Sequence, residues 1–167
     1  MLREKLMKKI AIIGAGISGL FIANLLDKSK NYQTTIYEKN KSIKTDEGYG
    51  IQLSVNSVKL LNKIGFNNLN KENKFTPEKI DFYLNKNLKK ICELNISNFN
   101  TNTCKYTTLK RSVLINFLQK DLKHLIKLNS NILKINKQNN QIKLSFENNE
   151  SVICDYLIIS DGSFFQM

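Results

Sequence analysis

The sequence predicts an α/β fold in which a parallel sheet grows from a strand–helix–strand unit at the start of the chain. Three observations predict this unit: a short apolar run at Lys9–Ile13, a helical apolar pattern at Ile17–Asp27 and a second β-rich run at Thr34–Tyr37. The crossover between the two strands should be right-handed. With 167 residues and 41% hydrophobic content, the chain can bury one core. We therefore expect residues 1–167 to form a single domain.

The middle of the chain predicts a helix and then a hairpin. Asn40–Tyr49 is a polar loop, and Asn56–Ile64 has the apolar spacing of a helix that Gly65 ends. Two strand-like runs, Lys79–Leu84 and Leu88–Leu94, flank a short Asn-rich turn.

The last third predicts one long helix and four strands. Ser112 could cap a helix that extends to Leu128, because apolar residues recur there at helical spacing. A three-strand meander should follow, at Ile132–Lys137, Gln141–Phe146 and Ser151–Ile153. The most apolar strand, Asp155–Ser160, should be central in the sheet and covered on both faces.

The formal net charge of +12 raises the possibility of nucleic-acid binding. However, only Arg3 and Arg111 among the 26 basic residues are arginine, and the lysines are scattered without long runs. Abundant Asn accompanies them. We interpret the charge as a bias in composition and expect no specific nucleic-acid partner.

Cysteine and histidine are too few for a zinc site. Cys92, Cys104 and Cys154 form no CxxC pair, and His124 is the single histidine. We expect no metal, a half-exposed surface histidine and reduced thiols in a cytoplasmic protein. The apolar run Ile10–Leu26 contains three glycines and is shorter than the ~20 residues of a membrane span, so no transmembrane segment is expected.

The strongest local motif is Gly14-Ala15-Gly16-Ile17-Ser18-Gly19, which follows a predicted strand and opens a predicted helix. The first glycine permits a tight turn, the second allows a pyrophosphate to approach the backbone, and the third lets helix and strand pack closely. Glu38 follows at about the 20-residue spacing at which an acidic residue binds ribose hydroxyls. Although glycines punctuate many structural turns, this full context predicts a dinucleotide site.

Four segments in this order resemble the FAD-dependent aromatic hydroxylases, a flavoprotein monooxygenase family whose salicylate-hydroxylase-like and ubiquinone-biosynthesis branches are the most similar. The first is the glycine motif with Tyr37-Glu38-Lys39. The second is the segment from Gly48 to Asn56, similar to the family's GxGIxLxxN. The third is Arg111-Ser112-Val113-Leu114, like the family's RxxL at a helix start. The fourth is Asp155 to Gly162, similar to its DxxxxxDG fingerprint.

The resemblance implies a Rossmann-like FAD-binding sheet and a set of cofactor contacts. These are Gly14, Ala15, Gly16, Ser18, Gly19, Glu38, Lys39, Gly50, Arg111 and Asp161. It also implies NAD(P)H as a transient reductant and a small aromatic or quinol-type substrate. The rigid guanidinium of Arg111 suits a phosphate in a way that lysine does not. No catalytic residue is identified.

The chain departs from the family pattern after Gly162, where Ser163-Phe164-Phe165-Gln166-Met167 replaces the family's continuation. The resemblance therefore covers an N-terminal portion of a hydroxylase, in which residues 71–102 would be the first piece of the substrate-binding sheet. We expect that this chain alone does not hydroxylate a substrate. A second polypeptide could supply the remaining part of the enzyme. An NAD(P)-binding dehydrogenase module and an inactive gene fragment remain alternatives.

Overall fold

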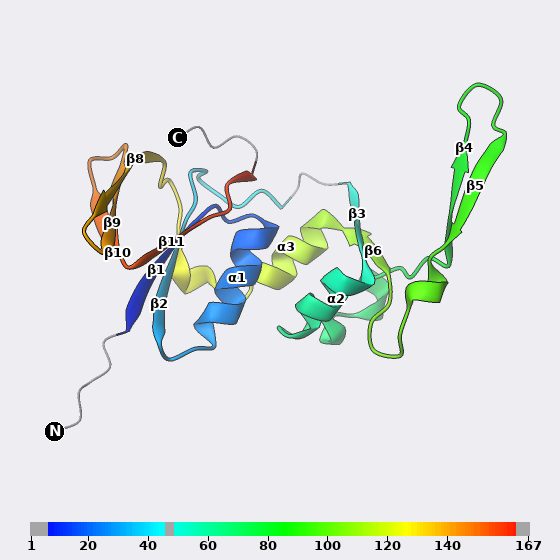
Figure 1. The fold of residues 1–167 in the computed structure, drawn as a ribbon, viewed down its shortest axis with the longest axis horizontal. Helices are drawn as coiled ribbons and strands as arrows, with labels where there is room; N and C mark the ends of the chain where they lie inside the picture. The colour runs from blue at the N-terminus through cyan, green and yellow to red at the C-terminus, as the bar shows by residue number, and fades with distance from the viewer. Residues whose placement is uncertain (1–6, 46–48, 163–167) are drawn as a thin grey trace. The chain divides into compact units, whose positions relative to one another are not determined.

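The computed structural model describes residues 7–45 and 49–162 (Figure 1). The chain divides into two compact units: the first unit is Met1–Thr45 with Leu118–Met167, and the second unit is Asp46–Phe117. Gly48 of the second motif and Ser163–Met167 lie outside the described residues.

The first unit is built on a four-stranded parallel sheet in the order β11-β1-β2-β7. Its elements are β1 (Lys8–Ile13), α1 (Ile17–Asp27), β2 (Tyr32–Tyr37), the 3-10 turn η4 (Lys123–Leu125), β7 (Ile126–Lys127), β8 (Ile132–Gln138), β9 (Gln141–Phe146), β10 (Ser151–Cys154) and β11 (Tyr156–Ile159). The mixed α/β fold with its strand–helix–strand unit is as the sequence predicts.

The parallel sheet lies between α1 and the antiparallel meander β8–β10, as Figure 1 shows. Ala11 and Tyr37 belong to a buried cluster with residues of the meander: Leu144, Phe146 and Cys154. Side chains alternate along a strand, so Ile12 and Ile36, both fully buried, belong to the face that α1 covers. The core of the first unit therefore has two layers, one on each face of the sheet.

The predicted position of the last strand is wrong. Within the described residues β11 pairs only with β1 and forms one end of the sheet, so it is not central. Tyr156 and Ile159 are 54% and 45% exposed, respectively. An apolar run predicts a buried strand, but its place in the order depends on pairing with distant residues.

The helix predicted from Ser112 to Leu128 is also wrong in extent. Helix α3 covers Arg111–Gln119, and the chain then passes through η4 into β7. Strand β7 pairs with β2, where Ile126 lies opposite Ile36. Leu122 is buried at the turn even though it leaves the helix. The strand hydrogen bonds of this pairing satisfy backbone groups along the edge of β2. They outweigh the helical preference that the apolar spacing of this segment indicates.

The second unit combines short helices with two separate antiparallel strand pairs. Its elements are β3 (Gly50–Leu53), α2 (Val55–Asn62), the 3-10 turns η1 (Phe66–Asn68), η2 (Lys71–Asn73) and η3 (Ser97–Phe99), β4 (Lys79–Tyr83), β5 (Lys90–Asn95), β6 (Thr107–Lys110) and the start of α3. The N-terminus of α2 is capped by Ser54, whose Oγ accepts a hydrogen bond from the Ser57 N–H. The apolar spacing of Asn56–Ile64 predicts that Leu60 lies on the buried side of this helix, but Leu60 is 46% exposed.

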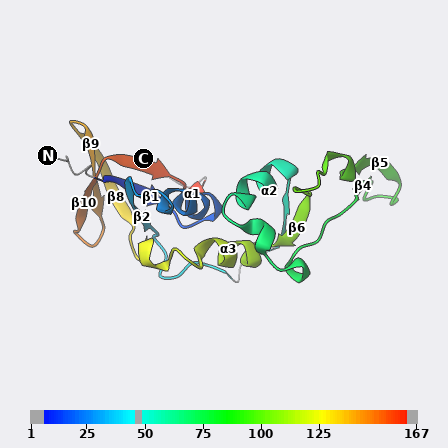
Figure 2. The ribbon, with the colours of Figure 1, turned by 90° about the horizontal axis from the view of Figure 1, so that it is seen from below.

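The predicted hairpin is present as the two-stranded ribbon β4–β5, which no third strand of the described chain joins (Figures 1 and 2). One face carries Lys79, Asp81, Lys90 and Glu93, which form a cluster of ion pairs. The other face carries apolar residues in cross-strand pairs, Ile80 with Leu94 and Phe82 with Cys92. The ribbon thus has the alternating pattern of a sheet that packs one face against another part of a protein and exposes the other face to solvent.

None of the helices in residues 7–45 and 49–162 is both long and apolar enough to cross a membrane.

Candidate functional site

The glycine motif forms the turn between β1 and α1, at the carboxyl end of the parallel sheet. Gly14 has φ of +95°, and its N–H donates a hydrogen bond of 2.9 Å to the Tyr37 carbonyl. A Cβ at this position would lie 2.7 Å from the Ser160 carbonyl oxygen. Both the left-handed backbone and the close approach of β11 therefore require glycine.

Gly19 and Gly16 serve different purposes. A Cβ on Gly19 would lie 2.1 Å from the Gly14 carbonyl oxygen, so this glycine lets α1 pack onto its own entry turn. A Cβ on Gly16 would meet nothing within 4 Å, so the space beside its backbone is open. Gly16 is the N-cap of α1, and Ser18 lies exposed in the first turn.

The N-terminus of α1 suits an anion. The N-cap makes no side-chain hydrogen bond, and no acidic residue lies in the first turn. Backbone N–H groups and the positive end of the helix dipole are thus left for a ligand. The open space beside Gly16 adjoins these groups, so the residues present fit the pyrophosphate of a dinucleotide.

Glu38 is buried directly after β2 and binds the glycine turn. Its Oε2 accepts a hydrogen bond of 2.9 Å from the Ala15 N–H. Its Oε1 accepts bonds from the Asn40 N–H and from Asn40 Nδ2, at 3.0 and 2.6 Å. A carboxylate has about four lone-pair sites. Glu38 therefore has capacity for a ribose hydroxyl while it holds the turn, a second role that its spacing alone did not reveal.

Lys39 and Asp161 extend from the ends of β2 and β11, on either side of β1. Lys39 Nζ lies 3.3 Å from Asp161 Oδ2. Both residues were predicted to contact a cofactor, and the structure pairs them with each other at the carboxyl edge of the sheet.

Sequence reasoning missed Ser160 as a residue of this edge. Its Oγ donates a hydrogen bond of 2.7 Å to the Ile13 carbonyl, which ties the end of β11 to the end of β1. The available signal was a serine directly before Asp161-Gly162 at a strand end.

Asp155, the first acid of the fourth motif, lies at the opposite edge of the sheet from the glycine turn. Its Oδ2 accepts a hydrogen bond of 2.8 Å from the Lys9 N–H, and its own N–H donates to the Lys9 carbonyl. The Lys9 N–H is the main reason that the pKa of Asp155 is lowered. Asp155 therefore anchors β11 to β1 and does not belong to the candidate site.

Two predicted site residues, Gly50 and Arg111, lie in the second unit and are brought together there. Gly50 begins β3 and lies opposite Lys110 in β6. Arg111 follows as the first residue of α3, and its N–H donates to the Tyr49 carbonyl at 3.2 Å. The antiparallel pair β3–β6 thus joins the second and third motifs, which are about 60 residues apart in sequence.

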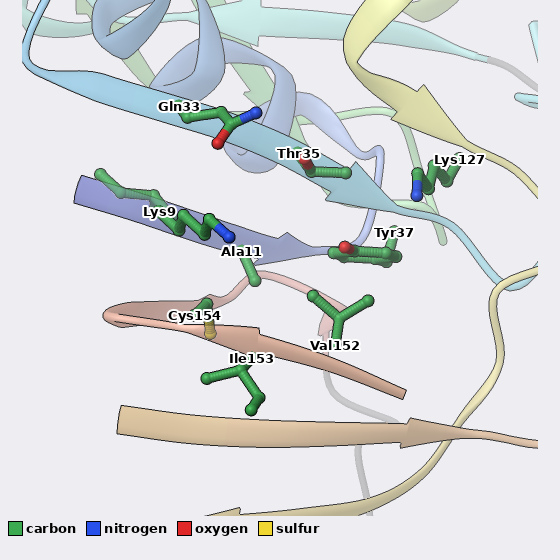
Figure 3. A pocket seen from close by; sticks show the side chains of 10 residues that line it. Lys9, Ala11, Gln33, Thr35, Tyr37, Lys127, Val152, Ile153 and Cys154 are labelled. Carbon is green, nitrogen blue, oxygen red and sulfur yellow. The ribbon is translucent and has the colours of Figure 1, made fainter. Parts of the chain in front are cut away.

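A separate recess of about 190 Å³ lies in the first unit between the parallel sheet and β10. Figure 3 shows Tyr37, Cys154 and the ammonium groups of Lys9 and Lys127 around it. Burial raises the pKa of both Tyr37 and Cys154, so neither is activated as a nucleophile. This recess is on the meander side of the sheet and shares no lining residue with the glycine turn.

The described residues contain no cluster of His, Cys, Asp and Glu that could hold a metal ion. All three cysteines are free thiols. His124 has a side chain that is 65% exposed, at 3.9 Å from Asp27 Oδ1.

Comparison with known proteins gives a family match and a curated relative. A family model described as an NAD(P)-binding Rossmann-like domain matches residues 12–46. The curated relative is 3-amino-4-hydroxybenzoate 2-monooxygenase PtnB3 of Streptomyces platensis, 40% identical over 57 residues. The aligned part is 34% of this chain and 14% of the relative.

Solved structures match over nearly the whole chain. A putative FAD-containing monooxygenase from Photorhabdus luminescens is 26% identical with a TM-score of 0.74, covering 93% of this chain and 40% of that one. Klebsiella pneumoniae HpxO, solved with FAD and uric acid, is 21% identical with a TM-score of 0.78, covering 93% of this chain and 39% of that one.

The chain thus spans about 40% of the length of the first solved structure that it matches. These comparisons confirm the Rossmann-like fold and the resemblance to FAD-containing monooxygenases that the four motifs predicted.

Proposed function

We propose that this chain is the FAD-binding N-terminal portion of an NAD(P)H-dependent flavin monooxygenase that hydroxylates a small aromatic or quinol-type ring. The resemblance to FAD-containing monooxygenases is the premise. The observation that carries the proposal is the open backbone at Gly16 beside the uncapped N-terminus of α1.

The residues of the candidate site would each contact a different part of the cofactor. The turn from Gly14 to Gly19, with Ala15 and Ser18, would bind the pyrophosphate. Glu38 would accept hydrogen bonds from the adenosine ribose hydroxyls. Lys39 and Asp161 would lie at the same edge. From the second unit, Gly50 and Arg111 would add a backbone segment and a phosphate-binding guanidinium. When bound, FAD supplies the redox chemistry, and the protein orients it and excludes water.

Both units would then belong to one FAD-binding domain, with residues 71–102 as the first piece of a substrate-binding sheet. The two-faced ribbon β4–β5 supports this assignment, because its apolar side chains are exposed in the described chain. We infer that catalytic turnover requires further protein surface to enclose the substrate, supplied by additional chain or by a second polypeptide. We also place the protein in the cytoplasm, in keeping with its free thiols.

An NAD(P)-binding dehydrogenase module is the second candidate, favoured by the description of the family model at residues 12–46. It shares the glycine turn but does not account for the β3–β6 pair that joins Gly50 to Arg111. It predicts that NADH binds more tightly than FAD.

The discriminating experiment is a pair of equilibrium titrations on the purified chain. Flavin fluorescence should be quenched as FAD binds, whereas NADH should bind more weakly under the same conditions. An Arg111→Lys variant keeps the charge but loses the bidentate fork, and it should weaken FAD binding. A Lys110→Arg variant is the matched control. Tight NADH binding with no effect on flavin fluorescence would refute the FAD proposal.

A further inference from the structure

A recess of about 490 Å³ lies in the second unit, at the end of α2 and the 3-10 turns that follow it. Its volume is within the range of about 300–1,000 Å³ that is usual for small-molecule sites. The glycine turn belongs to the first unit and contributes nothing to its lining. None of the lining residues is acidic.

Three lysines line this recess: Lys71, Lys74 and Lys105. Across residues 7–45 and 49–162, none of the three forms an ion pair with a carboxylate. Lysines elsewhere in the same unit behave differently, since Lys79 and Lys90 are paired with Asp81 and Glu93. The recess therefore gathers positive charge that its own walls do not neutralise.

Lys74 is the least exposed of the three lysines. It is half-buried, and its Nζ lies 5.3 Å from the centroid of the Phe66 ring. Its hydrogen bonds go to the Phe66 and Asn67 carbonyls, both at 3.4 Å. Burial, and next to it the charge of Lys71, lowers the pKa of Lys74. An anion in the recess would relieve both effects, because it supplies an opposite charge to a partly dehydrated ammonium.

Neutral donors complete the lining. Thr76 and Thr103 supply hydroxyl groups, and Asn102 supplies an amide, all from loops that border the recess. A phosphate group has several strong acceptor oxygens and a charge near −2 at neutral pH, so it can use three lysines and these donors together. A carboxylate offers only one charge. Val58 and Phe66 add an apolar part to the lining.

We propose that this recess binds a phosphate group, either free or carried by a small molecule, through residues that are not among the candidate cofactor contacts. Lysine acts here as a point charge, and the threonine and asparagine side chains orient the phosphate oxygens. The proposal does not depend on the proposed monooxygenase function.

The test is calorimetric titration of the full chain with inorganic phosphate, glucose 6-phosphate and sulfate at constant ionic strength. We expect saturable binding of phosphate that is weakened about tenfold or more in Lys74→Gln/Lys105→Gln, since each lysine provides a charge-assisted bond. Lys86→Gln/Lys134→Gln makes the same change in net charge outside the recess and should bind normally. Far-UV circular dichroism checks the folding of each variant, and Lys105→Gln alone alters only an exposed side chain.

The ligands distinguish the sources of the phosphate. Tighter binding of glucose 6-phosphate than of inorganic phosphate would support an organic phosphate, and equal binding would support free phosphate as the ligand. The proposal fails if sulfate and phosphate bind alike, or if the two double variants lose affinity equally, because either result indicates non-specific attraction by net charge. It also fails if phosphate does not bind.

Discussion

At the scale of single residues, the three motif glycines face different surroundings. Gly14 and Gly19 are enclosed by backbone atoms, whereas Gly16 faces open space. The same kind of substitution should therefore damage the fold at one position and only the ligand site at another. This separation allows binding and stability to be tested independently.

Gly16→Val should abolish FAD binding and leave the fold intact. The Gly16 backbone is in the β region, which valine adopts readily, and its Cβ would meet no atom within 4 Å. The side chain would instead occupy the space through which a pyrophosphate must approach. Flavin fluorescence titration and far-UV circular dichroism measure the two effects. Unchanged FAD affinity would remove the glycine turn from the site.

Gly19→Ala should destabilise the protein whether or not FAD is present. The new Cβ would lie 2.1 Å from the Gly14 carbonyl oxygen, and backbone atoms cannot move aside cheaply. We expect a loss of about 1–3 kcal/mol, as is typical of overpacking. Chemical denaturation of the FAD-free protein measures it. Ala23→Gly, also in α1 and completely buried, is a control for changes in helix propensity. An unaltered midpoint for Gly19→Ala would contradict the close packing.

At the scale of elements, β11 is joined to β1 by side chains at both ends. Asp155 binds the Lys9 N–H at the start of the strands, and Ser160 binds the Ile13 carbonyl at their end. These bonds supplement a strand pair of only four matched positions. The end strand of the sheet thus depends on polar contacts that an apolar sequence pattern does not reveal.

The contribution of Asp155 to stability should depend on pH. Its pKa is lowered in the folded state, so the stabilisation is complete above the unfolded value of about 3.9 and is lost as the pH falls through the folded value. Asp155→Asn should therefore lower Tm at pH 7, and the difference should shrink in acid. Thermal unfolding at several pH values measures it, with the exposed Asp121→Asn as control. A difference that grows in acid would refute this role.

At the scale of the whole chain, apolar surface is exposed on the ribbon β4–β5. Phe82 and Leu94 are 46% and 45% exposed on the same face, and Leu88 at the turn is 74% exposed. A two-stranded ribbon is marginally stable in water unless another element covers its apolar face. Contiguous apolar surface of this kind commonly marks an interaction site or an aggregation risk.

The chain should accordingly bind a hydrophobic dye and self-associate. Phe82→Thr/Leu94→Thr should reduce both properties, because threonine keeps the strand preference but removes most of the apolar surface. Leu133→Thr, which removes a single exposed leucine from β8, should change them little. Dye fluorescence and sedimentation velocity provide the measurements. A monodisperse native chain without dye binding would show that the ribbon needs no cover.

The sequence alone determined the local features of this protein. The glycine turn, the strand–helix–strand unit, the hairpin and the meander all follow from residue types and periods within short windows. The positive φ and close packing at Gly14 agree with the role that its place in the motif predicts. The candidate cofactor contacts were implied by the family resemblance that these motifs carry, and their role is still a prediction.

The tertiary structure alone decided the features that depend on distant residues. These include the end position of β11, the departure of the chain from α3 after Gln119 to form β7, and the pairing of β3 with β6. It also gave Glu38 a second role, as acceptor for the Ala15 N–H. Each of these features depends on backbone or carboxylate hydrogen bonds between segments that are distant in sequence. Periodicity describes which side of a segment is apolar, but it carries no information about which distant backbone group will satisfy that segment.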